Sequence, residues 1–424
     1  MGVVSCGTTM LDQGVFENIG AVTWDTTVKT SGFTAVSGNG YFCNTTSAAF
    51  TVTLPSSPSA GDIVGIKDYL NTADTNNITI GRNSSNIQGE AADFVISTEG
   101  RSVFLVYVDA TKGWLVTSSS QASDIASPQF VTATGGTITE SGDFKIHTFT
   151  SPGTFCVSNA GNACGSTSVD YMVVAGGGGG GAGEGSPGTN SANGGGAGAG
   201  GYRESSGAAS GCYSRSPLGA CVSALPVSAT GYPITVGAGG AAGPQNPLHT
   251  GLQGSNSIFS SITSTGGGFG GRGNSTAGPG GSGGSVGGAC GTGTAGTGNT
   301  PPVSPPQGQS GATNPSNSPP YAGSGGGGAT AAGSQGSGGN AGNGGAGATS
   351  SINATPTGRA GGGGGGKNTG TASSDQGFGG GFSGSTPNSN GDTNTGGGGG
   401  GANGNTITGG AGGSGVVIIR YKFQ

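Results

Sequence analysis

The stretch "MVVAGGGGGG" (Met172–Gly181) decides the fold of most of this chain. Its apolar residues are typical of a buried strand, and they pass directly into six consecutive glycines. Glycine loses more backbone freedom on ordering than any other residue, so a glycine run ordinarily predicts a flexible linker. Because similar runs recur throughout the rest of the sequence, an ordered structure has to be one in which bare backbone packs better than side chains.

Composition divides the chain into two parts. Of its 424 residues, 102 are glycine, with 16 in residues 1–150 and 86 in residues 151–424. Charged residues make up only 7% and the formal net charge is −5, whereas disordered solvating segments usually carry a high net charge. The few basic residues are scattered, so no nucleic-acid partner is expected.

Strand-like segments enclose the glycine-rich part. "SVDYMVV" (Ser168–Val174) opens it and "VVIIRYKF" (Val416–Phe423) closes it. We expect these two segments to pair, which would fix the entry and exit of everything between them. The glycines lack the strict Gly-X-Y period of collagen, so a continuous triple helix is not predicted.

A polyproline-II-like helix explains the glycine runs. It has three residues per turn and makes no hydrogen bonds to itself, so its N–H and C=O groups point to its neighbours. Where those neighbours are identical helices, only glycine leaves all three faces free. Runs of glycine then mark helices at the centre of a bundle, and runs interrupted by Ser, Ala or Asn mark helices with one exposed face. Inter-helix hydrogen bonds, at roughly 1 kcal/mol net each, have to offset the entropy of glycine.

The front of the chain has the alternation of β-strands, as in "FTVTL" (Phe50–Leu54). "SVFLVYV" (Ser102–Val108) is apolar on both faces, which predicts a second cover from a neighbouring layer or subunit. The predicted fold is all-β, with small β-sandwich-like modules followed by a polyglycine-II helix bundle. Its predicted parts are an N-terminal attachment segment (1–20), a fibre-type β module (21–118), a linker (119–129), a second β module (130–175), the glycine-rich region with variable loops (176–415) and a closing β-strand (416–424).

Motifs for catalysis are weak. "GGGGGGKNT" (Gly361–Thr369) has the spacing of a phosphate loop, but Asn368 replaces the Mg²⁺-binding Ser or Thr and no helix follows. The two histidines, His147 and His249, are far apart in sequence, and the seven cysteines show no CxxC spacing. The acidic residues stand alone among small residues. No catalytic residue, metal ligand or cofactor is predicted, and we do not expect an enzyme.

Recognition is expected in the segments between the glycine tracts, where larger side chains gather. Aromatic rings stack on sugars, and Arg pairs with carboxylate or phosphate groups. The alternative is that each aromatic side chain holds its loop against the bundle, and Phe269 and Phe378, flanked by glycines, are expected to do so. Deleting the Pro-rich segment Asn299–Tyr321 is expected to abolish adsorption without unfolding. The candidate receptor-binding residues are Tyr202, Arg203, Tyr213, Arg215, Arg272, Tyr321, Arg359 and Phe382.

These segments carry a family resemblance. "GGTITESGDFKIHTFTSPGTFCVSNAG" (135–161), "YPITVGAGG" (232–240) and "GGSGVVIIRY" (412–421) occur in this order. The region from about residue 129 to the C-terminus resembles the glycine-rich domain of tailed-phage fibres and adhesins, especially those of phages that infect marine bacteria and cyanobacteria. The front module is similar to a β module repeated in the same class of fibres.

The resemblance implies a virion protein of the tail or fibre tip, exposed to the extracellular medium. Related adhesins of T-even-like phages fold their glycine tracts into a polyglycine-II sandwich with variable loops at the tip. The implied partners are a host cell-surface glycan or outer-membrane protein and other virion tail proteins, and the implied assembly is a homotrimer. The alternative is a non-binding structural virion component, such as a decoration fibre or tail adaptor. A cellular ice-binding protein is disfavoured, because the tract lengths are too uneven for one flat face.

Overall fold

Strands and extended tracts make up both units of this chain, Met1–Ser127 and Pro128–Gln424, and each unit is described by itself. Among the described residues only η2 (Pro217–Gly219), a single 3-10 turn, is helical, so the predicted all-β fold is confirmed. None of the described helical segments has the length and apolar character needed to cross a membrane. The computed structural model describes residues 4–5, 8–9, 22–120, 128–162, 165–183, 192–211, 213–244, 249–273, 277–314, 322–367, 378–382, 389–404 and 408–424.

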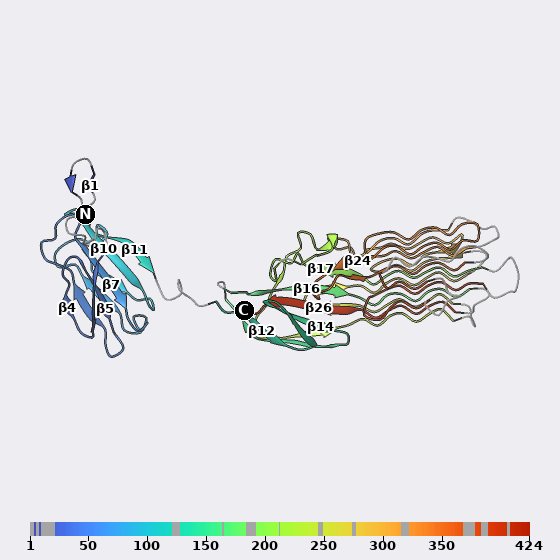
Figure 1. Cartoon of the computed structure of the whole chain (residues 1–424), viewed down its shortest axis with the longest axis horizontal. Coiled ribbons are helices and arrows are strands. Elements are labelled where there is room, and N and C mark those ends of the chain that lie inside the picture. The colour runs from blue at the N-terminus through green and yellow to red at the C-terminus, as the bar shows by residue number, and fades with distance from the viewer. Residues whose placement is uncertain are drawn as a thin grey trace. The chain divides into compact units, whose positions relative to one another are not determined.

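The first unit contains two sheets, of strand order β11-β10-β7-β5-β3 and β4-β6-β8-β9, and a separate β1–β2 hairpin. From β3 to β8 the chain alternates between the sheets, so successive coils stack with parallel pairing (Figure 1). This winding is solenoid-like. The strands are β1 (Val4–Ser5), β2 (Thr8–Thr9), β3 (Thr23–Lys29), β4 (Phe33–Thr34), β5 (Asn39–Cys43), β6 (Phe50–Thr53), β7 (Ile63–Asp68), β8 (Ile78–Gly81), β9 (Phe94–Ile96), β10 (Ser102–Asp109) and β11 (Gly113–Ser120).

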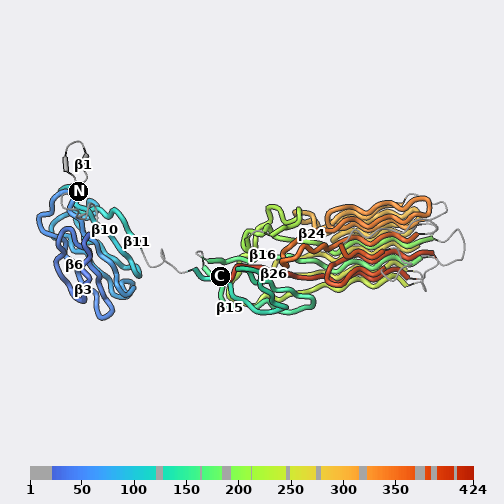
Figure 2. Tube along the Cα trace, in the orientation of Figure 1, coloured from blue at the N-terminus to red at the C-terminus, as the bar shows by residue number. Residues whose placement is uncertain are grey.

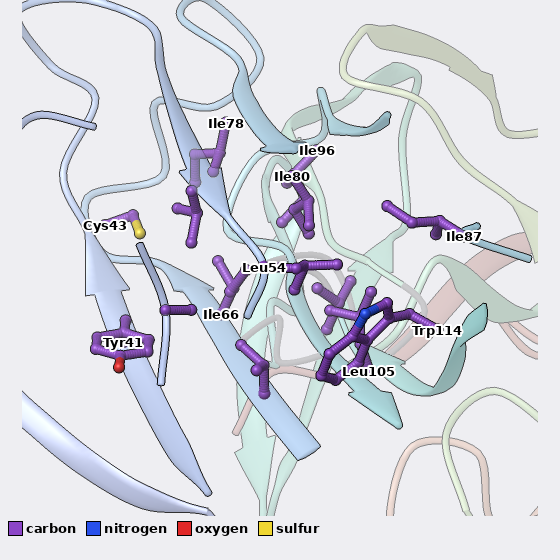
Figure 3. Close-up of a cluster of buried hydrophobic side chains, with 14 of the residues drawn as sticks. Tyr41, Cys43, Leu54, Ile66, Ile78, Ile80, Ile87, Ile96, Leu105 and Trp114 are labelled. Carbon is purple, nitrogen blue, oxygen red and sulfur yellow. The ribbon is translucent and has the colours of Figure 1, made fainter. Parts of the chain in front are cut away.

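The core of this unit lies between its two sheets and is lined by both, with Ile66 and Leu105 from one and Leu54, Ile80 and Ile96 from beside or within the other (Figure 3). Each of these side chains is fully buried. Side chains alternate along β10, so some of them reach the face of its sheet that is opposite to this core.

Strand β10 sends Val103 and Leu105 into the core and Phe104 to the opposite face of the sheet. There the ring centroid of Phe104 lies 6.0 Å from that of Trp24, which also stacks on Phe42 at 4.8 Å. The second apolar face of β10 is therefore covered in part by aromatic side chains of its own sheet.

The second unit begins with two facing sheets, of order β12-β15-β19-β20-β21 and β13-β14-β26-β16-β17, with β18 beside β16. β26 lies between β14 and β16, with Val174 opposite Val416, which confirms the predicted pairing of the opening and closing strands. The strands are β12 (Val131–Thr134), β13 (Thr137–Ser141), β14 (Phe144–Phe149), β15 (Gly153–Ala160), β16 (Ser168–Val174), β17 (Tyr202–Glu204), β18 (Leu225–Pro226), β19 (Gly231–Thr235), β20 (Ser257–Phe259), β21 (Ile262–Ser264), β22 (Ala277–Gly278), β23 (Cys290–Gly291), β24 (Ala348–Ser350), β25 (Thr357–Arg359) and β26 (Val416–Lys422).

Beyond β16 the glycine tracts run back and forth side by side as a bundle (Figures 1 and 2). The tract Gly176–Gly181 donates six backbone hydrogen bonds with N···O distances of 2.8 to 3.0 Å, and its carbonyl groups accept bonds from three other tracts, 240–243, 267–270 and 399–402. Six neighbours and a period of three are the pattern of a polyglycine-II helix at a bundle centre. Its donors pair as Gly176 and Gly179 with 252–255, Gly177 and Gly180 with 410–413, and Gly178 and Gly181 with 195–198.

Close approach between the tracts explains the glycines. A methyl group on Gly178 would lie 2.2 Å from the carbonyl oxygen of Gly268, and one on Gly179 would lie 1.9 Å from that of Ala241. Real Cβ atoms do not come so near to another atom, so neither position can carry a side chain.

The predicted rule for interrupted tracts holds at the edge of the bundle and fails at its centre. In the tract 237–244 the exposed residues Ala238, Ala241 and Pro244 recur every third position, as expected for one exposed face. The tract 192–201 also contains alanines, yet Ala197 and Ala199 are 0% exposed. The expectation that alanine marks an exposed helix is therefore wrong there, because some central positions leave space for a methyl group.

Candidate functional site

The end of the bundle that lies away from the sheets is here called the far end (Figure 2). Backbone bonds bring tracts together there, as between Gly243 and Gly180, Gly273 and Ala182, and Gly366 and Gly194. The chain leaves the described structure at this end after Gly183, Pro244, Gly273, Asn314, Lys367 and Gly404.

Most of the candidate receptor-binding residues lie at the opposite end, here called the base. Tyr202 and Arg203 belong to β17, and Arg359 belongs to β25. Tyr213 and Arg215 lie in the segment that follows β17. Tyr202 is 1% exposed and Arg359 is 6% exposed, so these two side chains offer little surface to a ligand.

The other candidates lie elsewhere. Arg272 is half-buried next to the far end, and Phe382 is half-buried at the end of the tract 378–382. Tyr321 lies outside the described residues.

The two phenylalanines expected to pack do so. A methyl group on Gly281 would lie 2.5 Å from the ring of Phe269, and one on Gly347 would lie 2.7 Å from Cβ of Phe378. Both side chains therefore lie directly against neighbouring glycine tracts.

Part of the Pro-rich segment Asn299–Tyr321 belongs to the bundle. The carbonyl groups of Gln309 and Ala312 accept hydrogen bonds from Val286 and Ala289 at 3.1 and 3.0 Å. Gln307 is fully buried. Deletion of the whole segment would remove a packed tract, so the expectation that it leaves the fold intact is wrong.

At the base, a buried carboxylate joins three segments. Glu204 is 1% exposed. It accepts hydrogen bonds from the Tyr202 hydroxyl at 2.9 Å, from the Ser216 N–H and hydroxyl at 3.0 and 2.6 Å, and from the Ser350 hydroxyl at 2.5 Å. Burial raises the pKa of Glu204, and the bonds from Ser216 and Ser350 oppose that shift. The pKa of Tyr202 is raised well above its usual value by burial and by Glu204.

A second buried carboxylate, that of Asp170 in β16, organises the segment 205–210. It accepts bonds from the Ser205 hydroxyl at 2.6 Å, from the N–H groups of Gly207 and Ala209 at 3.0 Å, and from the Ser210 N–H and hydroxyl at 2.7 and 2.6 Å. Asp170 is 0% exposed, so these five bonds replace its hydration.

Two arginines, Arg359 and Arg420, lie at the base together with Asp170 and Glu204. These four side chains are here called the charged layer. The Arg420 guanidinium lies 4.6 Å from the ring centroid of Phe144 and 5.3 Å from that of Tyr213, a cation–π arrangement on both. Nε and Nη1 of Arg359 are buried without a hydrogen-bond partner, and burial lowers the pKa of this group. The layer holds the segment after β17 and the β24–β25 hairpin on the sheet, which is a structural role.

The sequence gives no signal for this layer. Asp170 and Ser210 are 40 residues apart, and Glu204 and Ser350 are 146 apart. Among the residues that the structure describes, no group of three or more His, Cys, Asp or Glu side chains is placed to hold a metal ion.

Comparison with known proteins bears on the second unit. No curated protein matches the sequence. The model of the glycine-rich domain family matches residues 149–422, which run from β15 to β26 and include the buried carboxylates Asp170 and Glu204 and the whole bundle. This chain is a member of the glycine-rich domain family.

Proposed function

We propose that this protein is a tail fibre or adhesin of a tailed phage, which binds the host cell surface through the chain connections at the far end of its glycine bundle. It acts by binding alone, without catalysis, and works in the extracellular medium as part of the virion. Its partners are a host glycan or outer-membrane protein and neighbouring tail proteins, and it assembles as a homotrimer. The family membership and the quoted sequence segments support this proposal.

The observation that carries the proposal is the hydrogen-bond lattice of the central tracts. Gly176–Gly181 bonds to six other tracts, so this central tract is held by backbone groups on every side. Such a lattice presents few side chains of its own and fixes the positions at which the chain leaves it. A rigid scaffold with variable connections lowers the entropy cost of ordering a binding surface.

The burial of some candidate residues limits which of them can contact a receptor. Tyr202 and Arg359 are buried at the base, and Arg215 is exposed there. Arg272 and Phe382 are the described candidates that remain near the far end, together with Tyr321 in the connection 315–321. We therefore assign recognition to the far end, with Arg272, Phe382 and Tyr321 as its first candidates.

Adsorption of the labelled full-length protein to bacterial cells tests the proposal. Residues 315–321 are replaced by a Gly/Ser segment of equal length, which leaves the packed tract 307–314 in place. The matched control replaces the exposed residues 354–356, in the β24–β25 hairpin at the base. We expect the first change to abolish adsorption and the second to preserve it, with equal thermal stability. Adsorption that survives the far-end change and is lost with the control would refute the assignment.

The alternative, a structural virion component that binds no receptor, makes a different prediction. A chain located by cryo-electron microscopy at a collar or capsid position, whose labelled form adsorbs to no cell, would support the alternative. A position at a distal fibre end supports the adhesin.

A further inference from the structure

Buried asparagines lie where the bundle ends at its far end. Asn193 is 1% exposed, Asn314 is 3% exposed and Asn403 is 7% exposed. Burying an amide side chain is unfavourable unless it is hydrogen-bonded, so each of these residues needs a reason to be there. The reason lies in the register of the backbone hydrogen bonds between neighbouring tracts.

Within the bundle, donors three residues apart bond to acceptors three residues apart. Gly398 donates to Gly361 at 2.9 Å and Gly401 donates to Gly364 at 2.8 Å, so the next donor in that row is Gly404. Gly404 instead donates to Oδ1 of Asn193 at 2.6 Å. A side-chain oxygen thus takes the place of a carbonyl group where the lattice ends.

A second row ends in the same way. Gly361 donates to Phe378 at 3.0 Å and Gly364 donates to Gly381 at 2.9 Å, which makes Lys367 the next donor. The N–H of Lys367 is bonded to Oδ1 of Asn403 at 2.8 Å. The last donors of an ordered helix need partners from side chains, as the first N–H groups of an α-helix do.

The two bonds connect three places where the chain leaves the bundle. Asn193 follows the connection that starts after Gly183, Gly404 precedes the connection to residue 408, and Lys367 precedes the connection to residue 378. Because Asn403 and Gly404 are adjacent, the bonds that Asn193 and Asn403 accept form a continuous link between all three exits. Asn314 makes a separate link, since its Nδ2 donates to the Ala322 carbonyl at 2.5 Å across the connection 315–321.

We propose that Asn193 and Asn403 are positioning residues, which fix three chain exits relative to one another so that the connections used in binding start from fixed positions at the far end. This inference rests on the proposed function of the far end for its consequence in binding. The link itself stands on the hydrogen bonds among Asn193, Lys367, Asn403 and Gly404 and on the burial of the two asparagines.

The variants Asn193→Ala and Asn403→Ala test the link without any ligand. Each removes one acceptor, so we expect amide hydrogen exchange to rise about tenfold at Gly404 in the first and at Lys367 in the second, as for a donor that loses its buried partner. The control is Asn256→Ala at the base, where Oδ1 of Asn256 accepts the Gly266 N–H at 2.9 Å. Unchanged exchange at Gly404 and Lys367 would overturn the inference, whatever the adsorption data show.

Adsorption to the cell strain that binds the wild-type protein tests the consequence. We expect both alanine variants to bind about tenfold more weakly, at an unchanged melting temperature, and Asn256→Ala to bind like wild type. Asn193→Asp keeps an acceptor oxygen at the same place, and we expect it to bind more tightly than Asn193→Ala. Equal losses in all four variants would show a general effect of stability and contradict the positioning role. If the wild-type protein adsorbs to no cell, the proposed function fails, and the exchange experiment still decides the link.

Discussion

Gly179 shows the strictest requirement on a single residue in this protein. Its N–H donates to the Leu252 carbonyl at 2.8 Å, and a methyl group added at its Cα would lie 1.9 Å from the Ala241 carbonyl oxygen. Substitution with alanine has to push two tracts apart, and overpacking of this kind costs about 1–3 kcal/mol. We expect Gly179→Ala to lower the free energy of unfolding of the second unit by at least this amount, measured by chemical denaturation.

Gly153→Ala is the matched control for that substitution. Gly153 lies in β15, and a methyl group there would lie 3.4 Å from the Phe149 ring, an ordinary contact distance. We expect its free energy of unfolding to stay near the wild-type value. Equal destabilisation by both substitutions would contradict the close-approach argument.

His147 links protonation to stability. It is fully buried in β14, where Nδ1 lies 2.7 Å from the Gly135 carbonyl oxygen and Nε2 lies 3.0 Å from the Tyr421 hydroxyl. The neutral ring suits this site, with Nδ1–H donating to the carbonyl and Nε2 accepting from Tyr421. Burial lowers the pKa of His147, outweighing the bond to Gly135.

The pH dependence follows from that shift. The unfolded chain takes up a proton on His147 below about pH 6.5, while the folded chain resists it, so stability is full above this pH and falls as the pH decreases. We expect His147→Gln to flatten the change of melting temperature between about pH 5 and 7. His249→Gln, at an exposed histidine, is the control and should keep the wild-type profile. A profile that keeps its slope without His147 would exclude this residue as the cause.

Single positions could be predicted from the sequence where the physical rule is local. The six-glycine run predicts a central helix, because three faces with no side chain need glycine at every position. Ala197 escapes this rule, since its methyl group fits into a particular gap between tracts that are far apart in sequence. Asn193 and Asn403 escape it as well, because their partners are known only once the tracts are aligned.

Among the elements, the segment that follows β17 depends strongly on one side chain. Asp170 receives five hydrogen bonds from Ser205, Gly207, Ala209 and Ser210. Asp170→Asn replaces an acceptor by a donor that meets other donors, so we expect the segment to detach from β16. Trypsin should then cleave faster after Arg215, which is exposed within this segment. Asp392→Asn, at an exposed acid, should leave the cleavage rate unchanged, and equal rates in all three proteins would contradict the role of Asp170.

The strands themselves follow from alternation, but their partners do not. "VVIIRYKF" predicts a buried strand, and its place as β26 between β14 and β16 agrees with the expected pairing. In the first unit, the same alternation is compatible with antiparallel hairpins or with parallel coils. The register of β5 on β7, with Tyr41 opposite Ile66, selects the parallel coils, and this choice depends on contacts between strands that are not consecutive.

At the scale of the whole molecule, the second unit is closed by contacts between its first and last tracts. Gly177 donates to Gly413 at 2.9 Å, and Gly180 donates to Gly410 at 2.8 Å. Bonds across so much chain bring a large loop-closure cost, which is recovered only when many tracts pack together. Glycine adds to this cost, so a partly assembled bundle has little to stabilise it. The bundle should therefore form and unfold as one cooperative structure together with its sheets.

Truncation after Ile407 tests that cooperativity. It removes the tract 408–415 together with β26, and so takes away the Gly177 and Gly180 acceptors and the strand between β14 and β16. We expect fast hydrogen exchange throughout the second unit, including the tract 194–201, whose own hydrogen-bonding partners remain in the truncated chain. Deletion of Met1–Ser127 is the control, because the second unit is compact by itself, and it should leave the slow exchange of Gly176–Gly181 intact. Slow exchange that persists in 194–201 after the truncation would mean that the tracts form stable structure piecewise, and the far end would then not need the base in order to keep its shape.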